Sequence, residues 1–431
     1  MQLFDLDGDM LAEILTVCNK SSLLALSRTS SFGNILATPY LLRSVQLGRD
    51  RDQVISFLRY IITGSQGYDR TLNMPGIHIQ TLQICYPAFF PRNTMPTDRC
   101  QFVPNVSWAS GLTRAIALMP NIRTIEIEHS VESLFENSRS FVHTLMMSPH
   151  LRHIKLRGVA SFACELLGEA FEARDSLVPL QTLAVCALPF FGRGLMVLVS
   201  GEGIGKVLFQ ARDSLTEVCL KAFNLWNFTC PPAADPQHPG HNLDGPALPI
   251  QFPRVKTLYL DQCAIPYSAL SYSFPEVRIL TISNSLSRIS YARPTSPCSS
   301  PALLPKLSSL NAPDFDVLKF LQLGGTYINL CRLVIIDRPG LTPILFPYST
   351  DDLLTMLLAA PNLRSLHFSP PNHFTASDIE DMQWWHNFIK HVSHLTFLHF
   401  SVFTRLQQGF EQMVRIMSWP VITPLTTFGH S

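Results

Sequence analysis

The sequence predicts an α/β solenoid, in which a parallel sheet curves along the inside and helices cover the outside, preceded by a small helical domain. The first observation is a recurring pattern: apolar, two variable residues, apolar, one variable residue, apolar. Eleven segments show it and start 22 to 43 residues apart, which is the scale on which repeat proteins recur. They begin at Ile79, Ile122, Leu151, Leu180, Leu215, Val255, Val277, Leu307, Leu330, Leu363 and Leu395.

Proline supplies the second observation. It stands between a helical stretch and the following repeat segment at Pro120, Pro149 and Pro361. Proline cannot continue a helix and favours an extended residue before it, so it separates helix from strand. Alternating helices and strands indicate a parallel sheet with helical connections.

Composition excludes several classes of function. The chain has 431 residues, of which 46% are hydrophobic and 15% charged, with a formal net charge of +1. That balance gives no footprint for nucleic acid or an anionic membrane. No apolar run approaches the ~18 residues of a membrane span, and the acidic N-terminus lacks the features of a secretory signal. Ten cysteines without a CxxC pair favour reduced thiols in the cytoplasm or nucleus.

The first 47 residues predict three short helices and a strand. Met10, Leu11, Ile14 and Leu15 have helical spacing behind a cap at Asp7 or Asp9. We expect Ser21 or Ser22 to cap a second helix, and Pro39 to end a third after Phe32, Ile35 and Leu36. Residues 42–47 then alternate as a strand. A segment of this length buries little apolar area by itself. We therefore expect it to pack against a neighbouring repeat or a partner protein.

Residues 48–431 form the predicted repeat domain. It opens with a helix that ends at Gly64 and carries on one face Val54, Phe57, Leu58, Ile61 and Ile62. Two proline-rich stretches interrupt the rhythm, at 229–250 and 287–305, and we expect them to be exposed insertions between repeats.

The N-terminal segment resembles an F-box, and the whole chain resembles a fungal-type F-box protein with leucine-rich repeats. The resemblance rests on Leu6-Asp-Gly-Asp-Met-Leu-Ala-Glu-Ile-Leu15, on Ser22-Leu-Leu-Ala-Leu-Ser-Arg-Thr-Ser30 and on Leu36-Ala-Thr-Pro-Tyr-Leu-Leu-Arg-Ser-Val-Gln-Leu47. It covers both parts of the chain. An F-box usually opens with Leu-Pro, whereas here Asp7 follows Leu6.

The resemblance implies a substrate receptor that performs no chemistry itself. The F-box of this family docks on the Skp adaptor of a cullin–RING ubiquitin ligase, and the repeats hold a protein substrate. Carried over by position, the docking face would comprise Leu6, Met10, Leu11, Ile14, Leu15, Leu23, Leu24 and Leu26. Two alternatives stay open. One is a repeat scaffold whose N-terminal segment is only a cap, which the missing proline favours; the other is an α/β hydrolase, which eleven similar strand motifs disfavour.

The concave face of the sheet is the predicted substrate surface. Strand side chains alternate, so the residues between the apolar positions of each repeat point away from the core. In register, Glu126 should lie one strand from Lys155, and Glu128 one strand from Arg157. The candidate substrate-binding residues are Glu126, Lys155, Arg157, Tyr259, His367, Phe397 and His399.

Two motifs suggest cofactor chemistry but do not fit it. Residues 201–206 are glycine-rich, yet their spacing is wrong for a phosphate loop, and Val207 stands where Ser or Thr would bind magnesium. A flexible loop is the simpler interpretation. Cys230, His238 and His241 lack a fourth zinc ligand at plausible spacing. No catalytic arrangement stands out, so we predict neither an enzyme nor a cofactor.

Overall fold

The computed structural model describes residues 6–65, 74–90, 104–173, 179–187, 190–192, 195–225, 250–265, 267–283, 304–313, 326–336, 357–368 and 394–400, with residues 317, 321 and 390. The chain divides into two compact units, Met1–Phe228 and Thr229–Ser431. The predicted boundary at residue 47 lies inside the first unit and stays a prediction. The predicted insertions at 229–250 and 287–305 fall almost wholly outside the described residues.

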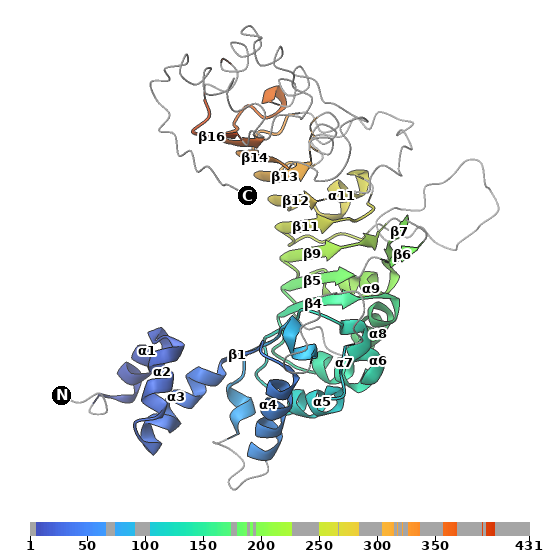
Figure 1. Ribbon diagram of the computed structural model, residues 1–431. Helices are drawn as coiled ribbons and strands as arrows, with labels where there is room; N and C mark the ends of the chain where they lie inside the picture. The colour runs from blue at the N-terminus through green and yellow to red at the C-terminus, as the bar shows by residue number, and fades with distance from the viewer. Residues whose placement is uncertain are drawn as a thin grey trace, which may run out of the picture. The chain divides into compact units, whose positions relative to one another are not determined.

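Three helices open the first unit, as predicted: α1 (Gly8–Val17), α2 (Lys20–Ser27) and α3 (Ser31–Leu42). Figure 1 shows them grouped beside β1. Asp7 caps α1 by accepting a hydrogen bond from the Met10 amide at 2.9 Å, which confirms one of the two expected caps. The expected Ser21 or Ser22 cap is wrong: Asn19 accepts from the Ser22 amide at 2.9 Å, so α2 starts earlier.

Pro39 does not end the third helix, contrary to our prediction, because α3 continues to Leu42. Proline lacks the N–H that would bond to the carbonyl four residues earlier, but the cost is confined to one bond in the last turns of the helix. The Thr38 hydroxyl donates to the Asn34 carbonyl at 2.7 Å beside it. The strand that follows, β1 (Ser44–Leu47), is correspondingly shorter than the predicted strand at 42–47.

The first unit contains a parallel sheet in the order β1-β2-β3-β4-β5-β9. Its remaining strands are β2 (Thr81–Ile84), β3 (Thr124–Ile127), β4 (His153–Val159), β5 (Thr182–Ala187) and β9 (Glu217–Lys221). The connections carry η2 (Pro75–His78), η3 (Tyr86–Phe89), α4 (Arg51–Gly64), α5 (Ala109–Ala117), α6 (Val131–Asn137), α7 (Arg139–Met146), α8 (Ser161–Glu172) and α9 (Glu202–Ala211). The sequence did not predict the β6–β7 hairpin (Phe190–Gly192, Leu195–Val197) or the β8–β10 pair (Val199–Ser200, Phe223–Asn224).

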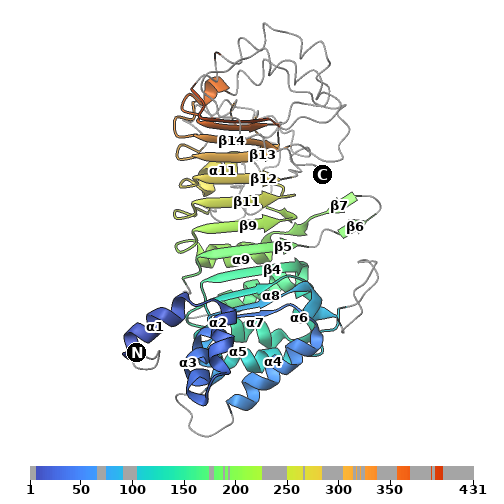
Figure 2. The same cartoon turned by 60° about the vertical axis from the view of Figure 1, so that its left-hand side comes forward.

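The second unit contains a parallel sheet in the order β11-β12-β13-β14-β15-β16 (Figure 2). Its strands are β11 (Thr257–Asp261), β12 (Ile279–Ser283), β13 (Ser309–Pro313), β14 (Arg332–Ile336), β15 (Ser365–Phe368) and β16 (Phe397–Phe400), and α11 (Tyr267–Ser273) follows the first. Each of the eleven predicted segments therefore contains a parallel strand, which confirms the expected large sheet.

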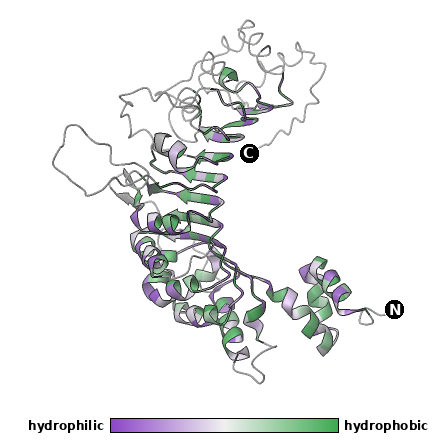
Figure 3. Ribbon diagram, turned by 180° about the vertical axis from the view of Figure 1, so that it is seen from behind, coloured by the Kyte–Doolittle hydropathy of each residue, from purple (hydrophilic) through white to green (hydrophobic). Residues whose placement is uncertain are grey.

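Buried and exposed side chains alternate along the strands of the repeats. Ile125 and Ile127 of β3 are fully buried, whereas Thr124 and Glu126, which alternate with them, are partly exposed. Figure 3 shows hydrophobic and hydrophilic residues alternating along the strands. An asparagine before the strand binds the preceding repeat: the side-chain amides of Asn121, Asn329 and Asn362 donate to the carbonyls of Ile77, Pro305 and Ile328 at 2.7–2.8 Å. These bonds satisfy turn carbonyls between neighbouring repeats.

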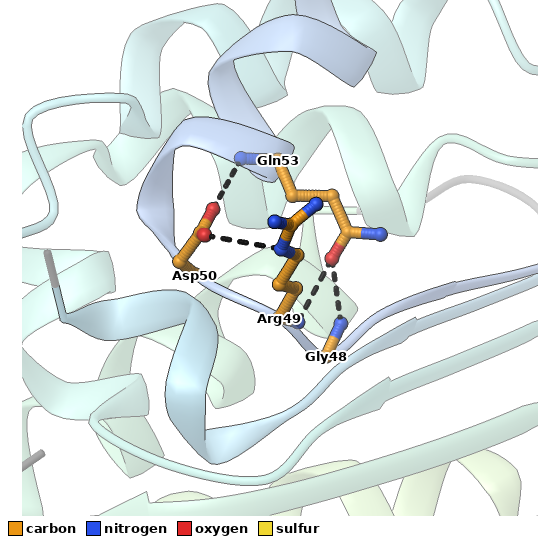
Figure 4. A network of polar contacts seen from close by, with 4 residues as sticks. All are labelled: Gly48, Arg49, Asp50 and Gln53. Carbon is orange, nitrogen blue, oxygen red and sulfur yellow. Dashed lines mark hydrogen bonds and ion pairs between the residues drawn. The ribbon is translucent and has the colours of Figure 1, made fainter. Parts of the chain in front are cut away.

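A polar network fixes the turn from β1 into α4 (Figure 4). The Gln53 side-chain oxygen accepts from the amides of Gly48 and Arg49 at 3.1 and 2.9 Å. Asp50 caps α4 by accepting from the Gln53 amide at 2.8 Å. This Asp-x-x-Gln arrangement satisfies amides that the turn would otherwise leave without partners, as a capping box does.

Glu132 of α6 caps a helix of the next repeat. Its carboxylate accepts hydrogen bonds from the amides of Ala160, Phe162 and Ala163 at 2.7–3.1 Å, at the start of α8. Ala160, the residue at the cap position, has no side-chain acceptor of its own. The carboxylate also faces the positive end of the α8 dipole.

We expect Glu132→Ala to lower the free energy of unfolding by about 2 kcal/mol, because it leaves three amides without their acceptor. Glu136→Ala removes an exposed carboxylate from the same helix and should stay within ~0.5 kcal/mol of the parent. Urea unfolding followed by circular dichroism measures both. Equal effects of the two substitutions would contradict the capping role.

Candidate interaction surfaces

The three N-terminal helices share a small core. Leu15, Leu23 and Ala37 form its buried centre. Partly buried residues pack against them: Cys18, Leu26, Leu36, Tyr40 and Leu41. One residue from each helix therefore meets at the centre, which holds the three helices together as a group.

A second apolar stripe runs along the outer side of α1. Leu11 and Leu15 are buried, whereas Met10, Ile14 and Val17 follow helical spacing on the other side. Met10 is 49% exposed and Val17 is 84% exposed. An outer stripe this apolar is unusual for a helix whose other side already faces a core.

The other two helices also expose large apolar side chains. Leu24 of α2 and Phe32 of α3 are exposed, and Ile35 of α3 is 64% exposed. Within the described residues, five of the thirteen exposed large hydrophobic side chains thus fall between residues 10 and 35. We call Met10, Val17, Leu24, Phe32 and Ile35 the exposed helical set. Burying it would release about 25 cal/mol per Å² of apolar surface.

The eight predicted docking residues divide by burial. Leu11, Leu15 and Leu23 lie in the interior, Met10 and Leu24 are exposed, and the half-buried residues are Leu6, Ile14 and Leu26. Burial leaves docking itself untested, but it decides which side chains a partner can touch. Sequence reasoning did not assign Val17, Phe32 and Ile35 to this surface. Val17 follows Ile14 by three residues, a spacing that could have indicated it.

The open face of the first sheet, formed by the side chains that alternate with the buried ones, is largely paired within itself. Lys155 Nζ lies 3.9 Å from a Glu126 carboxylate oxygen, so the predicted register is confirmed. His153 Nδ1 and the Thr182 hydroxyl are 3.0 Å apart, and that hydroxyl donates to Glu217 at 3.4 Å. The solvent-exposed ion pair of Lys155 with Glu126 contributes about 0–1 kcal/mol.

Glu128 does not follow the expected pairing with Arg157. The Glu128 carboxylate accepts hydrogen bonds from the Gln83 side chain at 2.8 Å and from the Tyr86 amide at 3.4 Å. The register of β3 on β4 ends at Ile127, so Glu128 turns toward the preceding repeat. Arg157 is exposed on β4.

The open face of the second sheet carries a different set of residues. His367 and His399 are direct partners on β15 and β16, with ring centroids 4.2 Å apart. The Phe397 ring lies 6.5 Å from that of His399. These three predicted residues therefore lie together, whereas Tyr259 lies on β11, at the other end of this sheet. Burial first, and then the charges of His399 and Arg332, lower the pKa of His367.

The glycine-rich stretch at 201–206 lies in the described part of the chain, whereas the possible zinc ligands do not. Residues 202–211 form helix α9 and not the flexible loop that we expected. A Cβ on Gly203 would lie 2.4 Å from backbone atoms of Cys164, so glycine permits close packing of α9 on α8. Cys230, His238 and His241 are not among the described residues. Across the described part, no group of three or more metal-ligating side chains gathers.

Comparisons with known proteins identify no family. No protein-family model matches the chain, and no curated protein matches its sequence. A solved structure described as a complex of Rad7 and Elc1 in yeast is similar over 92% of this chain and 88% of that chain, at 13% identity and a TM-score of 0.37. A likeness this low carries no weight for fold or function. No helix within the described ranges is long and apolar enough to cross a membrane.

Proposed function

We propose that this protein is the substrate-recognition subunit of a Skp–cullin–F-box type ubiquitin ligase. Helices α1–α3 dock on a Skp-type adaptor, and the open face of the repeats binds a protein substrate. The protein is a receptor without catalysis or cofactor, and it acts in the cytoplasm or nucleus. The seven cysteines among the described residues do not form disulfides, which is compatible with a reducing compartment.

The exposed helical set is the observation that carries this proposal. A three-helix group with its own core has no structural need for apolar residues on its outer side. Val17 and Ile35 are more exposed than any other large apolar side chain that the structure describes in the first 35 residues. Exposed apolar side chains on packed helices are typical of a surface that a partner covers. The sequence resemblance to an F-box then supports the adaptor as the partner.

A second candidate function is a repeat scaffold whose N-terminal segment is a cap. The pairing of β1 with β2 favours it, because the N-terminal segment supplies the first strand of the sheet. Helix α3 also contacts β1 and η2. A cap requires these inner contacts but gives no role to the exposed helical set.

The substitution pair Val17→Asp with Ile35→Asp separates the two functions. We expect it to weaken binding of a recombinant Skp adaptor at least about 100-fold, since each aspartate brings an unpaired charge into an apolar interface. The measurement is a pull-down followed by titration of the purified full chain.

The matched control is Thr16→Asp with Asn34→Asp, which adds the same charges at exposed neighbouring positions of the same helices. It should bind within about threefold of the parent chain. Circular dichroism verifies that both variants are folded. If the parent chain is folded and does not bind the adaptor, the scaffold function is correct.

A further inference from the structure

One row of side chains crosses the open face of the second sheet. Ile279, Ser309, Arg332, Ser365 and Phe397 are successive direct partners on β12 to β16. Neighbouring strands lie about 4.8 Å apart. Arg332 is therefore central, with Ile279 and Phe397 each about 10 Å away on opposite sides and a serine in between.

Both ends of this row are apolar and open to solvent. Ile279 is 45% exposed and Phe397 is 46% exposed. On the open face of a sheet, polar residues normally occupy such positions, while apolar ones face the core. Two large apolar side chains on one row are thus available to a ligand.

The charges of this sheet favour an anionic ligand. Arg332 is exposed, and the exposed Arg278 and Arg364 directly precede β12 and β15. None of these three forms a salt bridge with a residue that the structure describes. Among the described residues of this unit, the acidic side chains are Asp261, which is buried, and Glu276, which pairs with Lys306.

An adjacent row supplies hydrogen-bonding groups. Asn311 on β13 lies between Thr281 and Val334, one strand from Arg332. Its side-chain oxygen is buried and has no hydrogen-bond partner among the described residues. A buried acceptor without a partner is costly.

The first sheet provides a contrast at the same positions. There Lys155 lies beside Glu126, and the Thr182 hydroxyl joins His153 to Glu217. Those polar groups satisfy one another, so that face offers a ligand little unpaired charge. The second sheet instead combines exposed apolar residues with arginines that form no salt bridge among the described residues.

We propose that this open face binds an extended peptide segment with one anionic side chain at Arg332 and apolar side chains about three residues before and after it, at Ile279 and Phe397. An extended segment in the polyproline II conformation has three residues per turn and rises about 3.1 Å per residue, so side chains three positions apart lie on one face about 9 Å from each other. This spacing is close to the two-strand separation. As the recognition mode for a substrate, this inference rests on the proposed function. The binding itself does not require the adaptor.

The test is selection of a random twelve-residue display library on the purified full chain, on Arg332→Glu and on Arg254→Glu. Arg254 is exposed in the turn before β11 and serves as the charge-matched control. We expect the parent chain and Arg254→Glu to enrich peptides with an acidic residue three positions from apolar ones. Arg332→Glu should lose the acidic preference and favour Lys or Arg at that position.

An enriched peptide is then synthesised and titrated by fluorescence polarisation. Arg332→Ala should weaken its binding about tenfold or more, because a charge-assisted pair is lost. A version with phosphoserine at the acidic position distinguishes a phosphate from a carboxylate ligand. The proposal is overturned if no peptide is enriched, or if the acidic preference is absent or survives in Arg332→Glu. Because no adaptor is present, these outcomes are independent of adaptor binding.

Discussion

Leu15→Asp is expected to unfold helices α1–α3 while the repeats stay folded. Leu15 is 2% exposed at the centre of the core that the three helices share. Its loss removes buried apolar area, and the aspartate leaves a charge without a partner in that core, at a combined cost of about 4 kcal/mol or more. A core of three central residues has little stability in reserve. Each repeat contacts mainly its neighbours, so the loss should not spread.

Hydrogen exchange measured by mass spectrometry resolves this prediction along the chain. Amides of residues 8–42 should exchange rapidly in Leu15→Asp, while those of β3 to β9 keep their protection. Thr16→Asp adds the same charge at the next, exposed position and should exchange like the parent chain. Protection retained in the helices of Leu15→Asp would refute the shared core.

Gly203→Ala is expected to destabilise the first unit by about 2–3 kcal/mol. The new Cβ would lie 2.4 Å from the carbonyl carbon and oxygen of Cys164 and 2.7 Å from the Glu165 amide nitrogen. These are backbone atoms of α8, so the two helices must move apart and lose packing. Alanine has a higher helix propensity by about 1 kcal/mol, which offsets only part of that cost.

Gly111→Ala in α5 should change the free energy of unfolding in the opposite direction and stabilise the first unit. Its Cβ would meet a terminal carbon of the Leu58 side chain at 3.4 Å, which can adjust. Without a backbone clash, the gain from helix propensity remains, and we expect a stabilisation of about 0.5–1 kcal/mol. Thermal unfolding of both variants gives the comparison. A stabilised Gly203→Ala would mean that α8 and α9 do not pack as closely as described.

The strands could be predicted because their signal is local and repeated. In the repeat segments that contain β3 and β15, the alternation of apolar and other residues indicates which side of the strand faces the core. The register of neighbouring strands then follows from aligning the repeats. The pairing of Glu126 with Lys155 was predictable for the same reason. Arg332 and Ile279 hold the same position in their repeats, so aligned repeats also place them in one row, which our prediction of the substrate surface did not include.

Other features depend on contacts that the sequence does not display. The caps on α2 and α8 come from Asn19, one residue before its helix, and from Glu132, 28 residues before the first amide that it binds. Ser130, Ala222 and Gln262 have positive φ, a conformation that sequence rules assign to glycine or asparagine. Tertiary packing holds them there. Helix α3 passes through Pro39 because the helix has only three further residues to support.

The burial of the eight predicted docking residues could not be predicted in detail from the sequence. An apolar residue in an amphipathic helix counts toward the core on pattern alone, so Leu11 and Leu15 were grouped with Met10 and Ile14. Only the packing of three helices divides α1 into an inner and an outer stripe. Val17 could be assigned to the outer stripe only once the buried side of α1 was known, because it continues that stripe by one turn.

Calorimetric titration of a purified Skp adaptor into the full chain tests the central claim most directly. We predict saturable one-to-one binding for the parent chain and for Thr16→Asp with Asn34→Asp, and an affinity at least about 100-fold weaker for Val17→Asp with Ile35→Asp. No binding by a parent chain that circular dichroism shows to be folded, or equal binding by both double variants, would contradict it.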